Sequence, residues 1–131
     1  MADQYTIPKE TLESMSAEQL NQLPFGVVRI TGEGDILSYN DSESSISSKR
    51  VSEVIGKNFF REVAPCTNVL EFYGEYLKLR EKKVNGRAKI KFIFQFATGT
   101  MLVSVVMLYG ALSGQGTILV KPIAQEDRTA I

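Results

Sequence analysis

The chain has 131 residues, of which 44% are hydrophobic and 23% are charged. This length fits one domain, and this composition is that of a folded chain with a hydrophobic core rather than a disordered one. The 15 basic residues balance the 15 acidic residues, which argues against nucleic acid or an anionic membrane as the main partner. No apolar run approaches the roughly 20 residues that a membrane helix needs, and the N-terminus lacks the apolar core of a secretory signal.

Histidine is absent, and Cys66 is the only cysteine. Imidazole ligation of haem or zinc is therefore excluded, and so is a Cys–His nucleophilic pair. We expect no metal site, and we expect that the protein is not an enzyme, because no nucleophile–base set is recognisable. A single cysteine cannot form an intramolecular disulfide, so a reducing compartment, the cytoplasm, is expected.

The N-terminal third predicts a helical cap followed by a β-hairpin. Residues 1–8 are polar and are expected to be loose, and Ser16 and Gln19 fit a capping box for a short helix over 16–21. Leu20 and Leu23 are the apolar residues that this helix is expected to bury. Residues 25–31 and 36–39 are typical of strands, and the Gly/Asp-rich turn between them predicts a hairpin.

The middle of the chain predicts several short helices and one longer helix. Residues 40–50 are rich in Ser, Asp and Asn, which favour caps and short turns over a long helix. Residues 51–55 fit one helical turn closed by Gly56, and Asn58 fits the cap of a short helix over 59–64, ended by Pro65. A longer helix is predicted from about 68 to 84, from the helical spacing of its apolar residues, which are Val69, Phe72, Tyr73, Tyr76 and Leu77.

The last third predicts three strands. Ile90, Phe92, Phe94 and Phe96 alternate, so all four side chains are expected on one face, and two further strands are predicted over 101–109 and 117–123. The whole order predicts an α+β fold, namely a five-stranded antiparallel sheet with helices on one face, which is the PAS arrangement. We therefore divide the chain into a helical cap segment (1–24), a PAS domain (25–123) and a polar tail (124–131).

Specific segments make the sequence resemble the photoactive yellow protein family of PAS-domain blue-light receptors. The similarity covers most of residues 20–120 in order, and its most specific segments are Val54-Ile-Gly-Lys-Asn-Phe-Phe60 and Val63-Ala-Pro-Cys-Thr67. Shorter matching segments are Phe25-Gly26, residues 32–37, Tyr39-Asn40, Glu43, residues 71–74 and residues 111–114.

The resemblance implies a covalent chromophore and the residues that hold it. In that family p-coumaric acid is attached as a thioester to the cysteine that corresponds to Cys66. Tyr39 and Glu43 occupy the positions that hydrogen-bond the phenolate oxygen, and Ser47 replaces a threonine that supports the tyrosine. Lys49 stands where the family has a shielding arginine, and Phe92 stands where its best-known members have a tyrosine. The family also has a loop methionine near the positions of Gly99 and Thr100; it is absent there in this sequence, although Met101 is adjacent. The resemblance places the remaining pocket residues at Phe59, Pro65, Thr67 and Phe94.

The chemistry of a buried phenolate requires Glu43 to be a neutral acid in the dark. Its unperturbed pKa is about 4.3, and burial beside an anion shifts the pKa upward. In the implied cycle, light isomerises the chromophore, its phenolate takes the proton of Glu43, and a buried carboxylate remains. Partial unfolding that releases the N-terminal segment is then the expected signal, read by a separate downstream signalling protein.

The residues also leave two other functions open. The departures at Ser47, Lys49, Phe92 and the loop favour a PAS domain that binds a ligand or partner without a chromophore. Alternatively, Cys66 could act as a thiol redox sensor, with Lys57 and Arg61 as nearby cations. The oligomeric state is open in all three.

Overall fold

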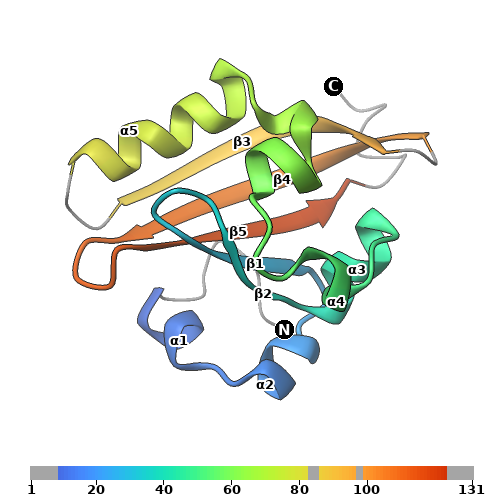
Figure 1. Ribbon diagram of the computed structural model, residues 1–131, viewed down its shortest axis with the longest axis horizontal. Helices are drawn as coiled ribbons and strands as arrows, with labels where there is room; N and C mark the ends of the chain where they lie inside the picture. The colour runs from blue at the N-terminus through green and yellow to red at the C-terminus, as the bar shows by residue number, and fades with distance from the viewer. Residues whose placement is uncertain (1–8, 83–85, 97–98, 124–131) are drawn as a thin grey trace.

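The computed structural model describes residues 9–82, 86–96 and 99–123. Its centre is one five-stranded sheet with the order β2-β1-β5-β4-β3, in which every neighbouring pair is antiparallel (Figure 1). The predicted α+β fold with a five-stranded antiparallel sheet is confirmed. The strands are β1 (Gly26–Thr31), β2 (Ile36–Tyr39), β3 (Gly86–Phe96), β4 (Gly99–Gly110) and β5 (Gln115–Pro122). The expectations for residues 1–8 and 124–131 fall outside the described residues.

The helices between β2 and β3 gather on one face of the sheet, as predicted, whereas the two N-terminal helices cover the opposite face (Figure 1). The first group comprises α3 (Asp41–Ser47), α4 (Val51–Val54), η1 (Phe59–Val63), η2 (Pro65–Thr67), η3 (Leu70–Gly74) and α5 (Glu75–Lys82). The second group comprises α1 (Lys9–Ser14), which the sequence did not predict, and α2 (Ala17–Asn21). None of the helices in the described ranges is long and apolar enough to cross a membrane.

Two separate cores result from the alternation of side chains along the strands. On β4, Val105 and Met107 face the larger core under α3–α5, while Val106 and Leu108 face the smaller core under the N-terminal cap. The predicted stripe on β3 is confirmed, because Ile90, Phe92, Phe94 and Phe96 all pack into the larger core. The cap covers only part of its face of the sheet, because the β3 side chains on that face, such as Lys91 and Ile93, are exposed. The larger core lies where the candidate site is built.

The predicted caps determine where the short helices begin. The Ser16 Oγ accepts a hydrogen bond from the backbone N–H of Gln19 at 3.2 Å, and the Gln19 side chain accepts from the Ser16 N–H at 2.8 Å, which confirms the capping box. Leu20 is buried, and Leu23 is half-buried. Asn58 caps η1 by accepting from the N–H groups of Phe60 and Arg61, both at 3.1 Å.

The predicted single helix over 68–84 is wrong at its start. Asn68 and Val69 precede the helix, with Val69 in an extended conformation and 41% exposed, and the first turn, η3, is a π-helix that continues into α5. A π turn changes the phase of the buried stripe, so Phe72, Tyr76 and Leu79 are buried in place of a stripe through Val69. Val84 falls outside the described residues.

Candidate functional site

Tyr39 and Glu43 are placed by the junction between β2 and α3. Tyr39 is the last residue of β2, and Asn40 is the N-cap of α3, where its Oδ1 accepts from the Glu43 N–H at 3.0 Å. This cap fixes the first turn of the helix, on which Glu43 points toward β1. The Ser/Asp/Asn-rich segment, for which the sequence predicted caps and short turns, therefore holds the Glu43 carboxyl group against the sheet.

Glu43 is 1% exposed and lies directly over Gly26 of β1. A Cβ atom at position 26 would lie 2.0 Å from its Oε1, so the carboxyl group occupies the space that glycine leaves open. This Oε1 is buried and has no hydrogen-bond partner in the described part of the chain. Burial raises the pKa of Glu43 to about 8, against a smaller opposite effect of its hydrogen bond with Tyr39. The acid is therefore mostly neutral at pH 7.

Tyr39 and Ser47 form the second part of this polar group. The Tyr39 hydroxyl donates to the Ser47 Oγ at 2.7 Å, and both side chains are buried. Burial first, and the neighbouring Glu43 second, raise the pKa of Tyr39 well above its ordinary range. The structure thus brings Tyr39, Glu43 and Ser47 together as a buried cluster in which both acids are protonated.

Cys66 lies across the larger core, on the short helix η2. Its Sγ accepts a hydrogen bond from the backbone N–H of Gln95 on β3 at 3.5 Å, and the residue is half-buried. The adjacent Thr67 is fully buried and donates from Oγ1 to the Ala64 carbonyl at 2.6 Å, which stiffens the turn. Pro65 opens η2 and is exposed. Cys66 and Tyr39 contact the same hydrophobic cluster.

Aromatic rings form the wall between the helices and β3. The Phe72 ring lies 6.1 Å from that of Phe59, 5.1 Å from that of Phe92 and 6.0 Å from that of Phe94, measured between ring centroids. Phe59 and Phe94 are each 1% exposed, while Phe92 is half-buried. Three of the predicted pocket residues therefore contact one common ring.

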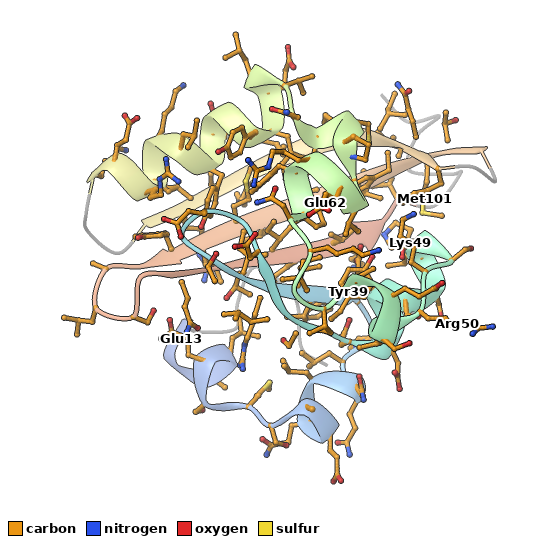
Figure 2. The ribbon with its side chains drawn as sticks, viewed as in Figure 1. Glu13, Tyr39, Lys49, Arg50, Glu62 and Met101 are labelled. Atoms are coloured by element: carbon orange, nitrogen blue, oxygen red, sulfur yellow. The ribbon has the colours of Figure 1, made fainter. Side chains whose placement is uncertain are left out.

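Lys49 and Met101 lie at the rim of this core. Lys49 follows α3 and is half-buried, whereas the neighbouring Arg50 extends away from the protein (Figure 2). Met101 is the third residue of β4, where it pairs with Phe94 and packs against the larger core. Figure 2 shows Tyr39, Lys49 and Met101 on the same side of the molecule, away from Glu13 of the N-terminal cap.

Gly26 and Asn40 have functional positions that the sequence did not predict, although both lie in segments that carry the resemblance. The Asn40 side chain makes four hydrogen bonds. Its Oδ1 accepts from the N–H groups of Val27 (2.8 Å) and Glu43 (3.0 Å), and its Nδ2 donates to the carbonyls of Leu20 (2.8 Å) and Phe25 (3.0 Å). Asn40 therefore joins α3, β1 and the N-terminal cap at one buried point.

We expect Asn40→Ala to lower the free energy of unfolding by about 2–4 kcal/mol, because it removes an N-cap and leaves buried backbone groups without partners. Asn40→Asp keeps the two acceptor contacts and loses the donors to Leu20 and Phe25, so it should loosen the cap more than α3. Urea unfolding followed by circular dichroism measures the first effect, and limited proteolysis near residue 20 measures the second. Equal proteolysis of wild type and Asn40→Asp would contradict the role of Nδ2.

The class of protein is shown by its similarity to a known family. The PAS fold family matches residues 14–120, so the chain is a PAS domain. The photoactive yellow protein of Halochromatium salexigens is 40% identical over 88 residues, which are 67% of this chain and 68% of that protein. The photoactive yellow protein of Rhodothalassium salexigens is 32% identical over 117 residues, or 88% of this chain and 91% of that protein.

A solved structure agrees with these relatives. The photoactive yellow protein domain of the sensor histidine kinase Ppr from Rhodospirillum centenum has a TM-score of 0.80 and 32% identity, covering 86% of this chain and 97% of that domain. The chain belongs to the photoactive yellow protein family, and the resemblance seen in the sequence is confirmed. It is thus a PAS-type photosensor, a signalling class of protein whose members' name implies a light-absorbing chromophore.

Proposed function

We propose that this chain is a blue-light photoreceptor that carries p-coumaric acid as a thioester on Cys66, with the phenolate oxygen held by Tyr39 and protonated Glu43. The observation that carries the proposal is the buried, unpartnered Oε1 of Glu43. A carboxyl oxygen buried without a hydrogen-bond partner costs free energy, so this atom favours a ligand that would supply the missing partner. An anionic oxygen fits best, because the protonated acid can donate to it.

The neighbouring groups support the same assignment. A p-coumaroyl phenol has an intrinsic pKa near that of tyrosine, about 10, and burial alone would raise it. Donation from Glu43 and Tyr39 opposes that effect, because O–H···O⁻ bonds are about twice as strong as neutral ones. Ser47, at 2.7 Å from the Tyr39 hydroxyl, can turn its own proton toward that oxygen and free the Tyr39 proton for donation.

Cys66 fits the anchoring role by chemistry and by position. A thioester requires a thiol, and the chain has one cysteine. The thiol is half-buried and packs against the larger core, and its Sγ accepts from the backbone of Gln95 on β3, so an attached aromatic group would lie beside this strand. Lys49 would contribute a positive charge at the rim in place of the planar arginine guanidinium.

When bound, the cinnamoyl group supplies visible-light absorption and a double bond that isomerises. On the protein side, Glu43 would give the proton of its carboxyl group to the phenolate oxygen, and its carboxylate would remain buried over Gly26. An unpaired buried charge costs several kcal/mol even after relaxation. Because Asn40 bonds both the first turn of α3 and the Leu20 carbonyl, movement of Glu43 loosens the cap, and release of the cap is the signal.

The test is reconstitution of the purified protein with activated p-coumarate, followed by intact mass and visible spectrum. We expect one added coumaroyl mass and a visible band, and Cys66→Ala should lose both completely. Cys66→Ala should still fold, which circular dichroism checks, because the residue is half-buried and small. A folded wild-type protein that forms no adduct would contradict the proposal and favour a chromophore-free ligand domain or a Cys66 redox sensor.

A further inference from the structure

The two edges of the sheet differ in whether they are closed. β2 forms one edge, where the Ile36 N–H donates to the Lys57 carbonyl and the Ile36 carbonyl accepts from the Gly56 N–H, both at 2.9 Å. β3 forms the other edge over eleven residues, and no strand of the described ranges pairs with its outer side (Figure 1). An edge of this length presents backbone groups that can pair with another chain.

Two hydrogen bonds show which β3 backbone groups point outward. The Gln95 N–H donates to the Cys66 Sγ and therefore points away from β4. The Leu102 carbonyl accepts from the N–H that follows β5, so Leu102 and its direct partner Ile93 do not bond each other. The β3–β4 pairing has no register shift, so every second residue of β3 points its N–H and C=O groups outward. Those of Lys91 and Ile93 have no partner among the residues described.

The side chains of this open edge alternate between basic and apolar. Arg87, Lys89 and Lys91 are exposed on the face of the sheet that carries the cap. Ile90 and Phe92 are half-buried on the opposite face, against the larger core. No acidic residue occurs between positions 82 and 125, although acidic and basic residues balance over the whole chain. The edge is therefore a local basic stripe on a chain without net charge.

The charges of this stripe select what the edge can pair with. Two β3 edges paired with each other would bring two basic stripes together, which is unfavourable, so the stripe discourages pairing with a second copy. The same charges favour a strand of opposite sign. A nucleic acid would use the cations, but it would use neither the outward backbone groups nor the half-buried apolar side chains. An acidic strand uses all three.

We propose that the outer edge of β3 binds an extended segment of a partner protein in which acidic residues alternate with apolar ones. The segment adds a strand to the sheet and pairs with the outward backbone groups of Lys91 and Ile93. Its acidic residues lie on the face of Lys89 and Lys91, and its apolar residues lie on the face of Ile90 and Phe92. This edge is open without a pigment, so the inference goes beyond the proposed photochemistry and does not depend on it.

The probe is a synthetic peptide of alternating glutamate and valine, about eight residues long, which is within the usual length of a strand. It is titrated at neutral pH into the ¹⁵N-labelled, pigment-free full chain and followed by NMR. We expect saturable binding that slows hydrogen exchange of the Lys91 and Ile93 N–H groups at least tenfold, because both become hydrogen-bonded. A peptide with the same residues in two blocks and an alternating lysine–valine peptide should each bind at least tenfold more weakly.

Two variants separate the charge from the backbone pairing. Lys91→Glu should weaken binding at least tenfold, whereas Lys57→Glu makes the same charge change on an exposed residue beside β2 and should bind as the wild type does. Ile93→Pro removes an outward N–H and spares the β3–β4 hydrogen bonds, so it should fold and lose most of the binding. Circular dichroism checks the fold. Independently of that variant, a backbone N-methylated glutamate–valine peptide should bind wild type at least tenfold more weakly.

Equal binding of the alternating and the blocked or N-methylated peptides would overturn the proposal, because charge alone would then explain it. No saturable binding, undiminished binding to Lys91→Glu, or exchange protection confined to β2 would overturn it as well. Protection of Lys91 and Ile93 that rises with protein concentration alone would assign the edge to a second copy. Tighter binding of single-stranded DNA or anionic lipid vesicles than of the peptide would assign the stripe to those partners instead. None of these readouts involves Cys66 or Glu43, so failure here is distinct from failure of the chromophore proposal.

Discussion

Glu43→Gln is expected to remove a large part of the pH dependence of stability of the pigment-free protein between about pH 5 and pH 8. In the wild type the folded-state pKa of Glu43 is raised to about 8 by burial, whereas the unfolded chain has an ordinary glutamate pKa. Below the unfolded pKa both states hold the proton, so this group adds no pH dependence. In this pH range Glu43 is buried in its neutral form, which destabilises the folded state least.

Above the unfolded pKa, the unfolded chain releases the Glu43 proton while the folded protein retains it. The folded state therefore binds more protons, and the free energy of unfolding falls as pH rises, by up to about 1.4 kcal/mol per pH unit. The fall ends as the pH passes the folded pKa of about 8. Glutamine fills the same space without a titrating proton, so Glu43→Gln should be the more stable protein at pH 8 by more than about 2 kcal/mol.

Urea unfolding of both proteins across this pH range measures the effect as a difference, which cancels the other carboxylates. Glu71→Gln, an exposed residue of η3, is the matched control and should follow the wild type. Parallel wild-type and Glu43→Gln curves would show that the carboxyl group is hydrated rather than buried. In the pigmented protein the same variant should keep the adduct and shift the absorption maximum, since an amide is a weaker donor than a carboxylic acid to a phenolate.

Gly26→Ala is the second change for which we expect a large effect. The new Cβ would lie 2.0 Å from the Glu43 Oε1 and 3.1 Å from both its Cβ and Cδ, so the acid must leave its site. Overpacking of this kind costs about 1–3 kcal/mol, and any charge that forms on the displaced acid is no longer buried. The variant should therefore be less stable at pH 5 and should lose most of the pH dependence assigned to Glu43. Reconstituted protein should show an altered absorption maximum.

Two further variants test whether the clash with the acid is the cause. In Gly26→Ala/Glu43→Ala the clashing Oε1 and Cδ atoms are gone, so the double variant should recover most of the stability that Gly26→Ala loses relative to Glu43→Ala. Gly74→Ala introduces a Cβ 3.5 Å from Leu70 Cδ2, an ordinary contact, and should change stability little. If the losses of stability of the two single variants simply add in the double variant, the destabilisation by Gly26→Ala comes from the β1 backbone and not from a clash with Glu43.

The sequence by itself determined the fold class, the strand order along the chain and the local caps. Alternation at Ile90, Phe92, Phe94 and Phe96 and the capping signals at Ser16 and Asn58 are local properties, so they can be predicted without the fold. The family followed from the segments around Asn58 and Cys66, because their residue order is specific. The same local signals misplaced the start of the helix before Phe72, since a π turn depends on tertiary packing.

Only the tertiary structure decided the features on which the proposed function depends. In the sequence, Glu43 is an ordinary polar residue of a serine-rich segment. In the fold it is buried against Gly26 of β1, which lies 17 positions earlier in the chain, and this burial keeps the acid neutral. The physical reason is that burial and hydrogen-bond satisfaction depend on neighbours distant in sequence, whereas strands and caps depend on near ones.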